Sequence, residues 1–261
     1  SLVLLGLLNP AIQTARALCG ASHFQRVQEE TGGPPVSQAS FSEMQAVVDP
    51  DLLAGLLREV AAQAQPLFGQ VRLRQQIDDL IANDGTLLPA LPRMAWALWQ
   101  NPQNRAGKLH LEFSLWRQVP VEFTVTDANT SERAVWKAKL RPGAFYVNDR
   151  NYSHDDRLIR EVHEAGASFV LRLHNNAVVT PLEAARPLTE ADRRAGVVQD
   201  MQVRLGRDPD GPLGRLVRVE ADGHTFLLFT DREDLAAELV ALIYRYRWQI
   251  DLFFKWIKCI L

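Results

Sequence analysis

A strict alternation of apolar and polar residues over 108–115 is the feature that most constrains the fold. Every second residue in this run is apolar, and a repeat of two places those side chains on one face of a β-strand. A second alternating run covers 119–125 and follows the short link Arg117-Gln118. Two such runs joined by a short link predict an antiparallel hairpin with one face on a core.

Three short apolar runs further along the chain are typical of buried central strands, and helical patterns alternate with them. The runs cover 145–147, 168–173 and 225–229, and the predicted helices cover 131–140, 153–166 and the segment from about 233 onward. Strands that alternate with helices predict the α/β class, with a mixed sheet and helices packed against it.

The pattern also predicts how the chain is divided. Residues 1–75 carry apolar side chains at helical spacing, for example Leu52, Leu56 and Val60, which predicts a helical N-terminal region. Residues 76–261 form the predicted α/β core. Within that core, 175–224 is rich in Pro and Gly and has mixed charge, which predicts a β-rich insertion of short strands before the last helix.

The charge balance excludes a generally basic chain. The 261 residues include 29 Lys and Arg against 31 Asp and Glu, a net charge of −2, so a nucleic-acid surface would have to be local. The two cysteines, Cys19 and Cys259, form no disulfide framework, which predicts a reducing compartment. The apolar run at 2–8 is too short to span a membrane and is predicted to be a buried helix.

Several enzyme classes lack their sequence signatures here. The six histidines show no zinc-ligand spacing, and the two cysteines form no Cys-x2-Cys pair. The chain has no P-loop, no Gly-x-Gly-x-x-Gly and no Gly-x-Ser-x-Gly, which argues against nucleotide binding and against a serine hydrolase.

The last predicted helix carries two faces on a helical wheel. An apolar face anchors it to the sheet and consists of Leu235, Leu239, Leu242, Tyr246, Ile250, Phe253 and Ile257. A second face presents a phenol, a guanidinium, a carboxylate and an ammonium in a row, from Tyr244, Arg247, Asp251 and Lys258. The simplest interpretation of this row is a solvated face with an ion pair between Arg247 and Asp251 at i, i+4.

Two further aspartates are placed where predicted strands end. Asp84 stands in Asp84-Gly85-Thr86, and Asp149 follows the strand at 145–147. Ligand-binding groups gather at strand ends in open α/β sheets. Together with Asp251, these carboxylates could bind two divalent ions and activate water for phosphodiester chemistry. Carboxylate oxygens suit Mg²⁺ or Mn²⁺.

These positions resemble the DDE transposases of bacterial insertion sequences, and the resemblance covers most of 76–261. The spacing Tyr244-x2-Arg247-x3-Asp251-x6-Lys258 is similar to the family's Tyr-Arg-Glu-Lys signature, Asp84-Gly85-Thr86 to its first-aspartate motif, and Asp149-Arg150-Asn151-Tyr152 to its second, usually Asp-Arg-Gly-Tyr. Lys108, His110 and Val125-Thr126-Asp127 look like strand segments of the same family.

The resemblance implies an RNase H-like fold and a metal-dependent enzyme that nicks transposon ends and joins the freed 3′ hydroxyl to target DNA. The implied catalytic residues and ligands of two Mg²⁺ or Mn²⁺ ions are Asp84, Asp149 and Asp251, and the implied DNA-phosphate contacts are Tyr244, Arg247 and Lys258. The implied partners are the terminal inverted repeats and the target duplex. The resemblance is compatible with a homodimer on the DNA, and it implies no membrane partner. The implied location is the bacterial cytoplasm, at the nucleoid.

The chain departs from the family in two motifs. Asp251 stands where the family has Glu, which moves the carboxylate by roughly 1.5 Å and disturbs a strict Mg²⁺ geometry. Asn151 replaces a typical Gly, which is tolerated if the position needs a positive φ.

Two alternatives stay open: a truncated or catalytically impaired transposase remnant that only binds DNA, and an RNase H-like nuclease without strand transfer. Since the chain begins at Ser1 and ends inside a helical pattern, we expect it to be a fragment.

Overall fold

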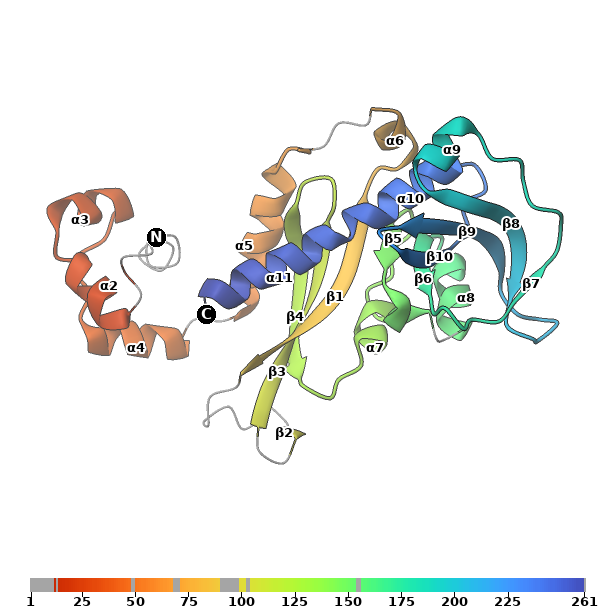
Figure 1. Ribbon diagram of the computed structural model, residues 1–261. Coiled ribbons are helices and arrows are strands. Elements are labelled where there is room, and N and C mark those ends of the chain that lie inside the picture. The colour runs from red at the N-terminus through yellow and green to blue at the C-terminus, as the bar shows by residue number, and fades with distance from the viewer. Residues whose placement is uncertain are drawn as a thin grey trace. The chain divides into compact units, whose positions relative to one another are not determined.

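The structure, a computed structural model, describes residues 12, 14–47, 50–67, 71–89, 99–101, 104–153 and 156–260 (Figure 1). The chain divides into two compact units, one of residues 1–56 with 257–261 and one of residues 57–256. The apolar run at 2–8 lies outside the described residues. The boundaries at 75 and at 175–224 stay predictions.

The described part of the first unit is helical, as its pattern predicts. It contains α2 (Ala15–Ala21), α3 (Gln25–Thr31), α4 (Gln38–Val47) and the first part of α5 (Pro50–Gln63). The hydroxyl of Thr14 caps α2 by accepting a hydrogen bond from the Ala17 N–H at 3.1 Å. Leu18, Cys19 and Phe41 form a small core. Among the described residues of the whole chain, no helix has the length and apolar character to cross a bilayer.

In the residues that the structure describes, the second unit is built on a mixed sheet of ten strands. The strands are β1 (Leu80–Pro89), β2 (Trp99–Asn101), β3 (Asn104–Ser114), β4 (Val119–Asp127), β5 (Phe145–Asn148), β6 (Ser168–Leu173), β7 (Val179–Pro181), β8 (Val197–Leu205), β9 (Leu213–Ala221) and β10 (His224–Thr230). Their order is β2-β3-β1-β5-β6-β10-β9-β8-β7, and β4 also pairs with β3. Strand β5 is parallel to β1 and β6, whereas the other pairings are antiparallel. The predicted α/β class is confirmed.

Helices cover both faces of this sheet. They are α6 (Val71–Gln76), α7 (Glu132–Lys137), α8 (Asp156–Glu164), α9 (Glu190–Arg194), α10 (Ala237–Tyr246) and α11 (Trp248–Ile260). On one face, Leu73 of α6, Ile243 of α10 and Ile250 of α11 belong to the larger core. On the other face, Trp136 of α7 and Ile159 of α8 belong to a second core. The sheet therefore lies between two helical layers.

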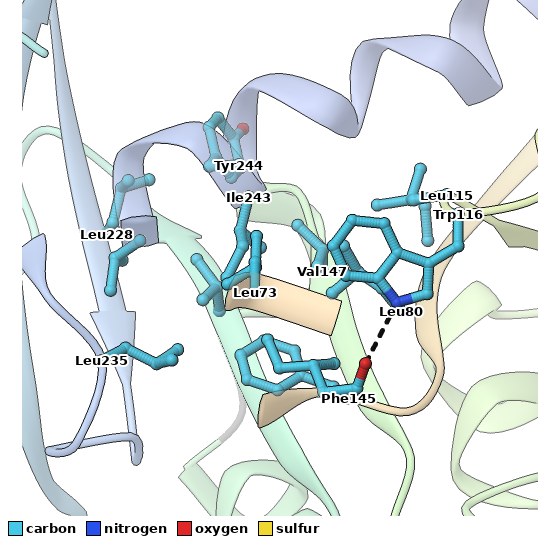
Figure 2. Packing of buried hydrophobic residues seen from close by; sticks show 14 of the residues in the cluster. Leu73, Leu80, Leu115, Trp116, Phe145, Val147, Leu228, Leu235, Ile243 and Tyr244 are labelled. Carbon is cyan, nitrogen blue, oxygen red and sulfur yellow. Dashed lines mark hydrogen bonds between the residues drawn. The ribbon is translucent and has the colours of Figure 1, made fainter. Parts of the chain in front are cut away.

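Strand β5 is buried throughout and contributes to both cores. Phe145 and Val147 belong to the larger core, whereas Tyr146 belongs to the second. Figure 2 shows the larger core, where Trp116 donates its indole N–H to the carbonyl of Ile77 at 3.3 Å. A strand covered on both faces is apolar on both, so the prediction of a central strand at 145–147 is confirmed.

The predicted hairpin is also confirmed, as β3 and β4, but its burial differs from the prediction. The polar side chains His110 and Glu112 are 5% and 3% exposed, so β3 is covered on both faces here. The Nε2 atom of His110 lies 2.8 Å from the Thr126 hydroxyl, and Glu112 accepts a hydrogen bond from Arg141 at 2.8 Å. These partners allow polar groups on a face that the alternation assigns to solvent.

Residues 175–224 contain β7, α9, β8 and β9, and two of these strands are longer than predicted. Strands β8 and β9 have nine residues each and extend the main sheet beyond β10. Asp200 of β8 and Arg215 of β9 form a buried ion pair diagonally across the two strands, with two hydrogen bonds of 2.7 Å. A two-residue turn with positive φ at Asp222 and Gly223 joins β9 to β10.

The last helix begins at Ala237 and divides at Arg247 into α10 and α11. The prediction of a separate polar face is wrong for α10, because Tyr244 and Arg247 are only 5% and 8% exposed. Val240 and Ile243 lie outside the apolar face of the wheel, yet both are fully buried. The buried arc of the helix is therefore wider than its Leu and aromatic positions indicate, and it includes part of the polar row.

Candidate active site

Asp84 lies on β1 just beyond the part of the strand that pairs with β5. That parallel pairing stops at Ala82, while the antiparallel pairing with β3 continues to Pro89. The prediction that a strand ends at Asp84 is therefore wrong, since only the pairing with β5 ends there. Asn148, the last residue of β5, accepts a hydrogen bond from the Asn83 N–H at 3.0 Å and holds the two strands together where they part.

Asp149 directly follows β5, as predicted. It begins the 3₁₀ turn η1 (Arg150–Tyr152), and its Oδ1 accepts a hydrogen bond from the Asn151 N–H at 2.8 Å. Asp84 is held in a similar way, because its Oδ1 accepts from the Gly85 N–H at 2.8 Å. The backbone thus fixes one oxygen of each carboxylate and orients both groups in advance.

The guanidinium of Arg247 lies between Asp84 and Asp251. Its Nη2 donates to Asp251 Oδ2 at 3.0 Å, and its Nη1 lies 3.9 Å from Asp84 Oδ2. The side chain is 10% exposed, and its Nε has no hydrogen-bond acceptor among the described residues. The ring centre of Tyr244 lies 5.9 Å from the guanidinium carbon. The predicted i, i+4 ion pair is therefore confirmed, but the arginine is buried rather than solvated.

The three aspartates and Arg247 act on one another electrostatically. The pKa of Asp84 is raised to about 7, chiefly by burial and also by the neighbouring charges of Asp149 and Asp251. The Gly85 N–H and Arg247 act in the opposite direction. Burial also lowers the pKa of Arg247, but the Tyr244 phenol and all three carboxylates outweigh it, so this pKa lies above its usual value. Asp84 and Asp251 thus contact the guanidinium, and the charge of Asp149 also acts on it.

A divalent ion needs several oxygen ligands around one point. As the side chains stand, the described ranges contain no group of three His, Cys, Asp or Glu residues arranged to hold a metal ion. The guanidinium of Arg247 contacts both Asp84 and Asp251. The donors are carboxylate oxygens, which suit Mg²⁺ or Mn²⁺, and Asp84 and Asp251 already contact a cation, the Arg247 guanidinium. The chemistry of these residues therefore suits the ion that the resemblance implies, whereas their arrangement in the described ranges does not form a site for it.

The other two members of the predicted row differ from each other. Tyr244 is buried in the larger core and packs against Phe226, with ring centres 6.0 Å apart. Burial raises the pKa of its phenol, while Arg247 and Arg172 act to lower it. Lys258 belongs to the first compact unit and is exposed in the last turn of α11. The structure thus brings Tyr244 beside Arg247, and the roles of Tyr244 and Lys258 in DNA binding stay predictions.

Sequence reasoning missed Glu132, in the first turn of α7. Its Oε1 lies 3.8 Å from Lys108 Nζ, and its Oε2 accepts a hydrogen bond from Asn151 Nδ2 at 2.9 Å. A Cβ on Gly85 would lie 2.8 Å from Oε1, so the glycine makes room for this carboxylate. An acid in the first turn of a helix is common, and no further signal in the sequence distinguishes Glu132.

Asn151 does not adopt a positive φ, so a positive φ is not the reason that Asn can stand in place of Gly at this position. Asn151→Gly is expected to lower the free energy of unfolding by about 1 kcal/mol, because it removes the hydrogen bond to Glu132 and frees the backbone. Urea unfolding measures this loss. Asn129→Gly, at an exposed loop position, is the matched control for backbone freedom, and an equal loss in both variants would show that the hydrogen bond contributes nothing.

Comparison with known proteins identifies relatives of this chain. Residues 75–260 match the family described as "Transposase DDE domain". The chain is 31% identical over 180 residues to transposase y4zB of Sinorhizobium fredii, covering 67% of this chain and 50% of that protein. It is 25% identical over 182 residues to a transposase for insertion sequence element IS5377 of Geobacillus stearothermophilus, covering 68% and 47%. The chain thus spans about half the length of these curated relatives.

The fold has a counterpart among solved structures. A piggyBac transposase, in a synaptic complex with hairpin DNA, superposes with a TM-score of 0.52 and 11% sequence identity. The match covers 97% of this chain and 56% of the piggyBac chain. At this identity the likeness concerns the fold alone, and it supports the expected RNase H-like sheet with flanking helices. Because the family match covers most of the sequence, the chain belongs to the transposases with a DDE domain.

Proposed function

We propose that this chain carries out DNA transposition by metal-dependent phosphodiester hydrolysis and strand transfer at transposon ends. The single observation that carries the proposal is the placement of Asp84 and Asp251 on either side of the Arg247 guanidinium in a DDE domain, with Asp149 at the end of the neighbouring strand β5. The spacing Tyr244-x2-Arg247-x3-Asp251-x6-Lys258 supports membership of the group with the Tyr-Arg-Glu-Lys signature. The proposed setting is the bacterial cytoplasm, on double-stranded DNA.

In this proposal Asp84, Asp149 and Asp251 hold two Mg²⁺ or Mn²⁺ ions. When bound, these ions would activate the attacking oxygen and stabilise the leaving oxygen of the phosphodiester. The N–H groups of Gly85 and Asn151 keep the first two carboxylates oriented. Asp251 is the adjustable member, because it comes from α11 and its side chain is 39% exposed.

The cationic side chains are proposed to contact DNA phosphates. Arg247 offers a planar fork that matches a phosphate, and Lys258 offers a point charge. Tyr244 packs beside the guanidinium and limits where it can move. Because Tyr244 is buried, we assign it a positioning role for Arg247 in addition to the proposed phosphate contact.

A plasmid assay tests the proposed function. Supercoiled plasmid carrying the DNA that flanks the gene is incubated with the chain and Mn²⁺, with EDTA as the control. Nicking at fixed end sequences followed by joining to a second DNA supports transposition. Nicking without end preference or joining favours an RNase H-like nuclease. Binding without nicking favours an impaired remnant, and recovery of nicking by Asp251→Glu would assign the impairment to the shorter third acid.

Arg247→Ala and Lys258→Ala are each expected to weaken duplex DNA binding and to flatten its dependence on salt. Losing one phosphate contact reduces the slope of log K against log salt by about 1. Fluorescence anisotropy with a labelled duplex across a salt series, in Ca²⁺ to prevent turnover, gives the slopes. Lys137→Ala is the control, because Lys137 is exposed on α7 and pairs with Glu161. A slope unchanged by either variant would remove that residue from the DNA contacts.

A further inference from the structure

The most unusual group in the site is the Arg247 guanidinium itself. It is nine-tenths buried, yet its contacts with the neighbouring carboxylates are one hydrogen bond of 3.0 Å to Asp251 and one ion pair of 3.9 Å to Asp84. Its Nε has no acceptor among the described residues. A buried guanidinium with an unused N–H is incompletely satisfied, so few hydrogen bonds hold it in this position.

The position of this guanidinium conflicts with a metal ion. Arg247 contacts one oxygen of each of two proposed ligands, Oδ2 of Asp84 and Oδ2 of Asp251. The other oxygen of Asp84 is already held by the Gly85 N–H. A divalent cation on these oxygens and a guanidinium a few ångströms away would repel each other, and the burial of Arg247 strengthens that repulsion. The two cations therefore exclude each other.

We propose that Arg247 is an exchangeable counter-ion of the metal site: it neutralises the carboxylates while no metal is bound, and metal binding releases it to a DNA phosphate. This inference rests on the proposed function, because it takes the three aspartates as metal ligands. It adds that metal binding at these aspartates is coupled to DNA binding through Arg247. Metal and DNA each favour the state in which the guanidinium has left the carboxylates, so each increases the affinity for the other.

The position of Arg247 in the chain suits an exchange of this kind. Arg247 lies at the junction of α10 and α11, where its N–H donates to the Tyr244 carbonyl and its carbonyl accepts from the Ile250 N–H. The backbone of Arg247 is thus held by these two hydrogen bonds, while its long side chain has several rotatable bonds. Leaving the carboxylates breaks the two contacts named above and changes the packing against the Tyr244 ring, and Arg247 itself is not a member of the larger core.

Mn²⁺ binding to variants of Arg247 tests the exchange without any turnover. The loss of the electron paramagnetic resonance signal of free Mn²⁺ gives the dissociation constant. Arg247→Gln is expected to bind Mn²⁺ about tenfold more tightly than the original chain. Arg247→Lys keeps a cation and should stay close to the original. Arg245→Gln, an exposed position on α10, changes the net charge equally and controls for long-range electrostatics.

A second measurement needs no substitution at Arg247. A short duplex added to the original chain is expected to tighten Mn²⁺ binding severalfold, because the phosphate holds the released guanidinium. If Mn²⁺ binds and Asp149→Asn abolishes binding, but neither Arg247→Gln nor DNA tightens it, the exchange is wrong and the proposed metal site stands. If no form of the chain binds Mn²⁺, with or without DNA, the metal site and the exchange are both wrong.

Discussion

Asp84→Asn is expected to stabilise the second unit by up to about 4 kcal/mol above pH 8 and to leave its stability unchanged below pH 4. The folded pKa of Asp84 is about 7, above the usual 3.8, chiefly because the carboxyl is buried. The folded state therefore binds more protons than the unfolded state between these values. Its stability falls as pH rises from about 4 to 7, and Asn at position 84 removes this loss.

Thermal unfolding at several pH values measures the effect. For a domain of this size, 1 kcal/mol corresponds to roughly 2–4 °C in Tm. The difference in Tm between variant and original chain should grow from near zero at pH 4 to its maximum above pH 8. Asp208→Asn, in an exposed turn, is the matched control and should show no such trend. A pH-independent difference for Asp84→Asn would mean that the carboxyl titrates normally.

Asp149→Asn is expected to reduce Mn²⁺-dependent nicking at least roughly 1000-fold, since losing about 4 kcal/mol of transition-state stabilisation has this effect. The substitution keeps an oxygen that can accept the Asn151 N–H, so η1 should survive. It removes the charge that a metal ligand needs. Asp208→Asn again serves as the control. Nicking at the original rate by a folded Asp149→Asn protein would exclude Asp149 as a ligand.

The sheet was the most predictable part of the molecule. Period-two alternation and continuous apolar runs report directly on which faces of a strand are buried, and they predicted β3, β4, β5 and β6. The lengths of β8 and β9 were not predictable in this way. In the sequence, Asp200 and Arg215 resemble surface charges. In the structure they form a buried ion pair with two hydrogen bonds. Such pairing depends on contacts between strands.

The site was predictable in its residues and less so in its geometry. Asp149 and the Arg247–Asp251 pair follow from a strand end and an i, i+4 spacing. A helical wheel cannot show that a helix is buried over a wide arc, so Arg247 was expected in solvent. Glu132 lies near Asp84 because α7 packs beside Gly85, and nothing in the sequence pattern predicts that contact.

Calorimetric titration with Mn²⁺ tests the central claim, that three carboxylates converge on a metal site, most directly. Mn²⁺ is suited to carboxylate oxygens, so it probes the site whether or not Asp251 is long enough for Mg²⁺. We predict saturable binding to the chain and its loss in Asp149→Asn, with Asp208→Asn binding like the original. Binding that survives Asp149→Asn, or no binding by a folded chain in the presence of duplex DNA, would contradict the claim.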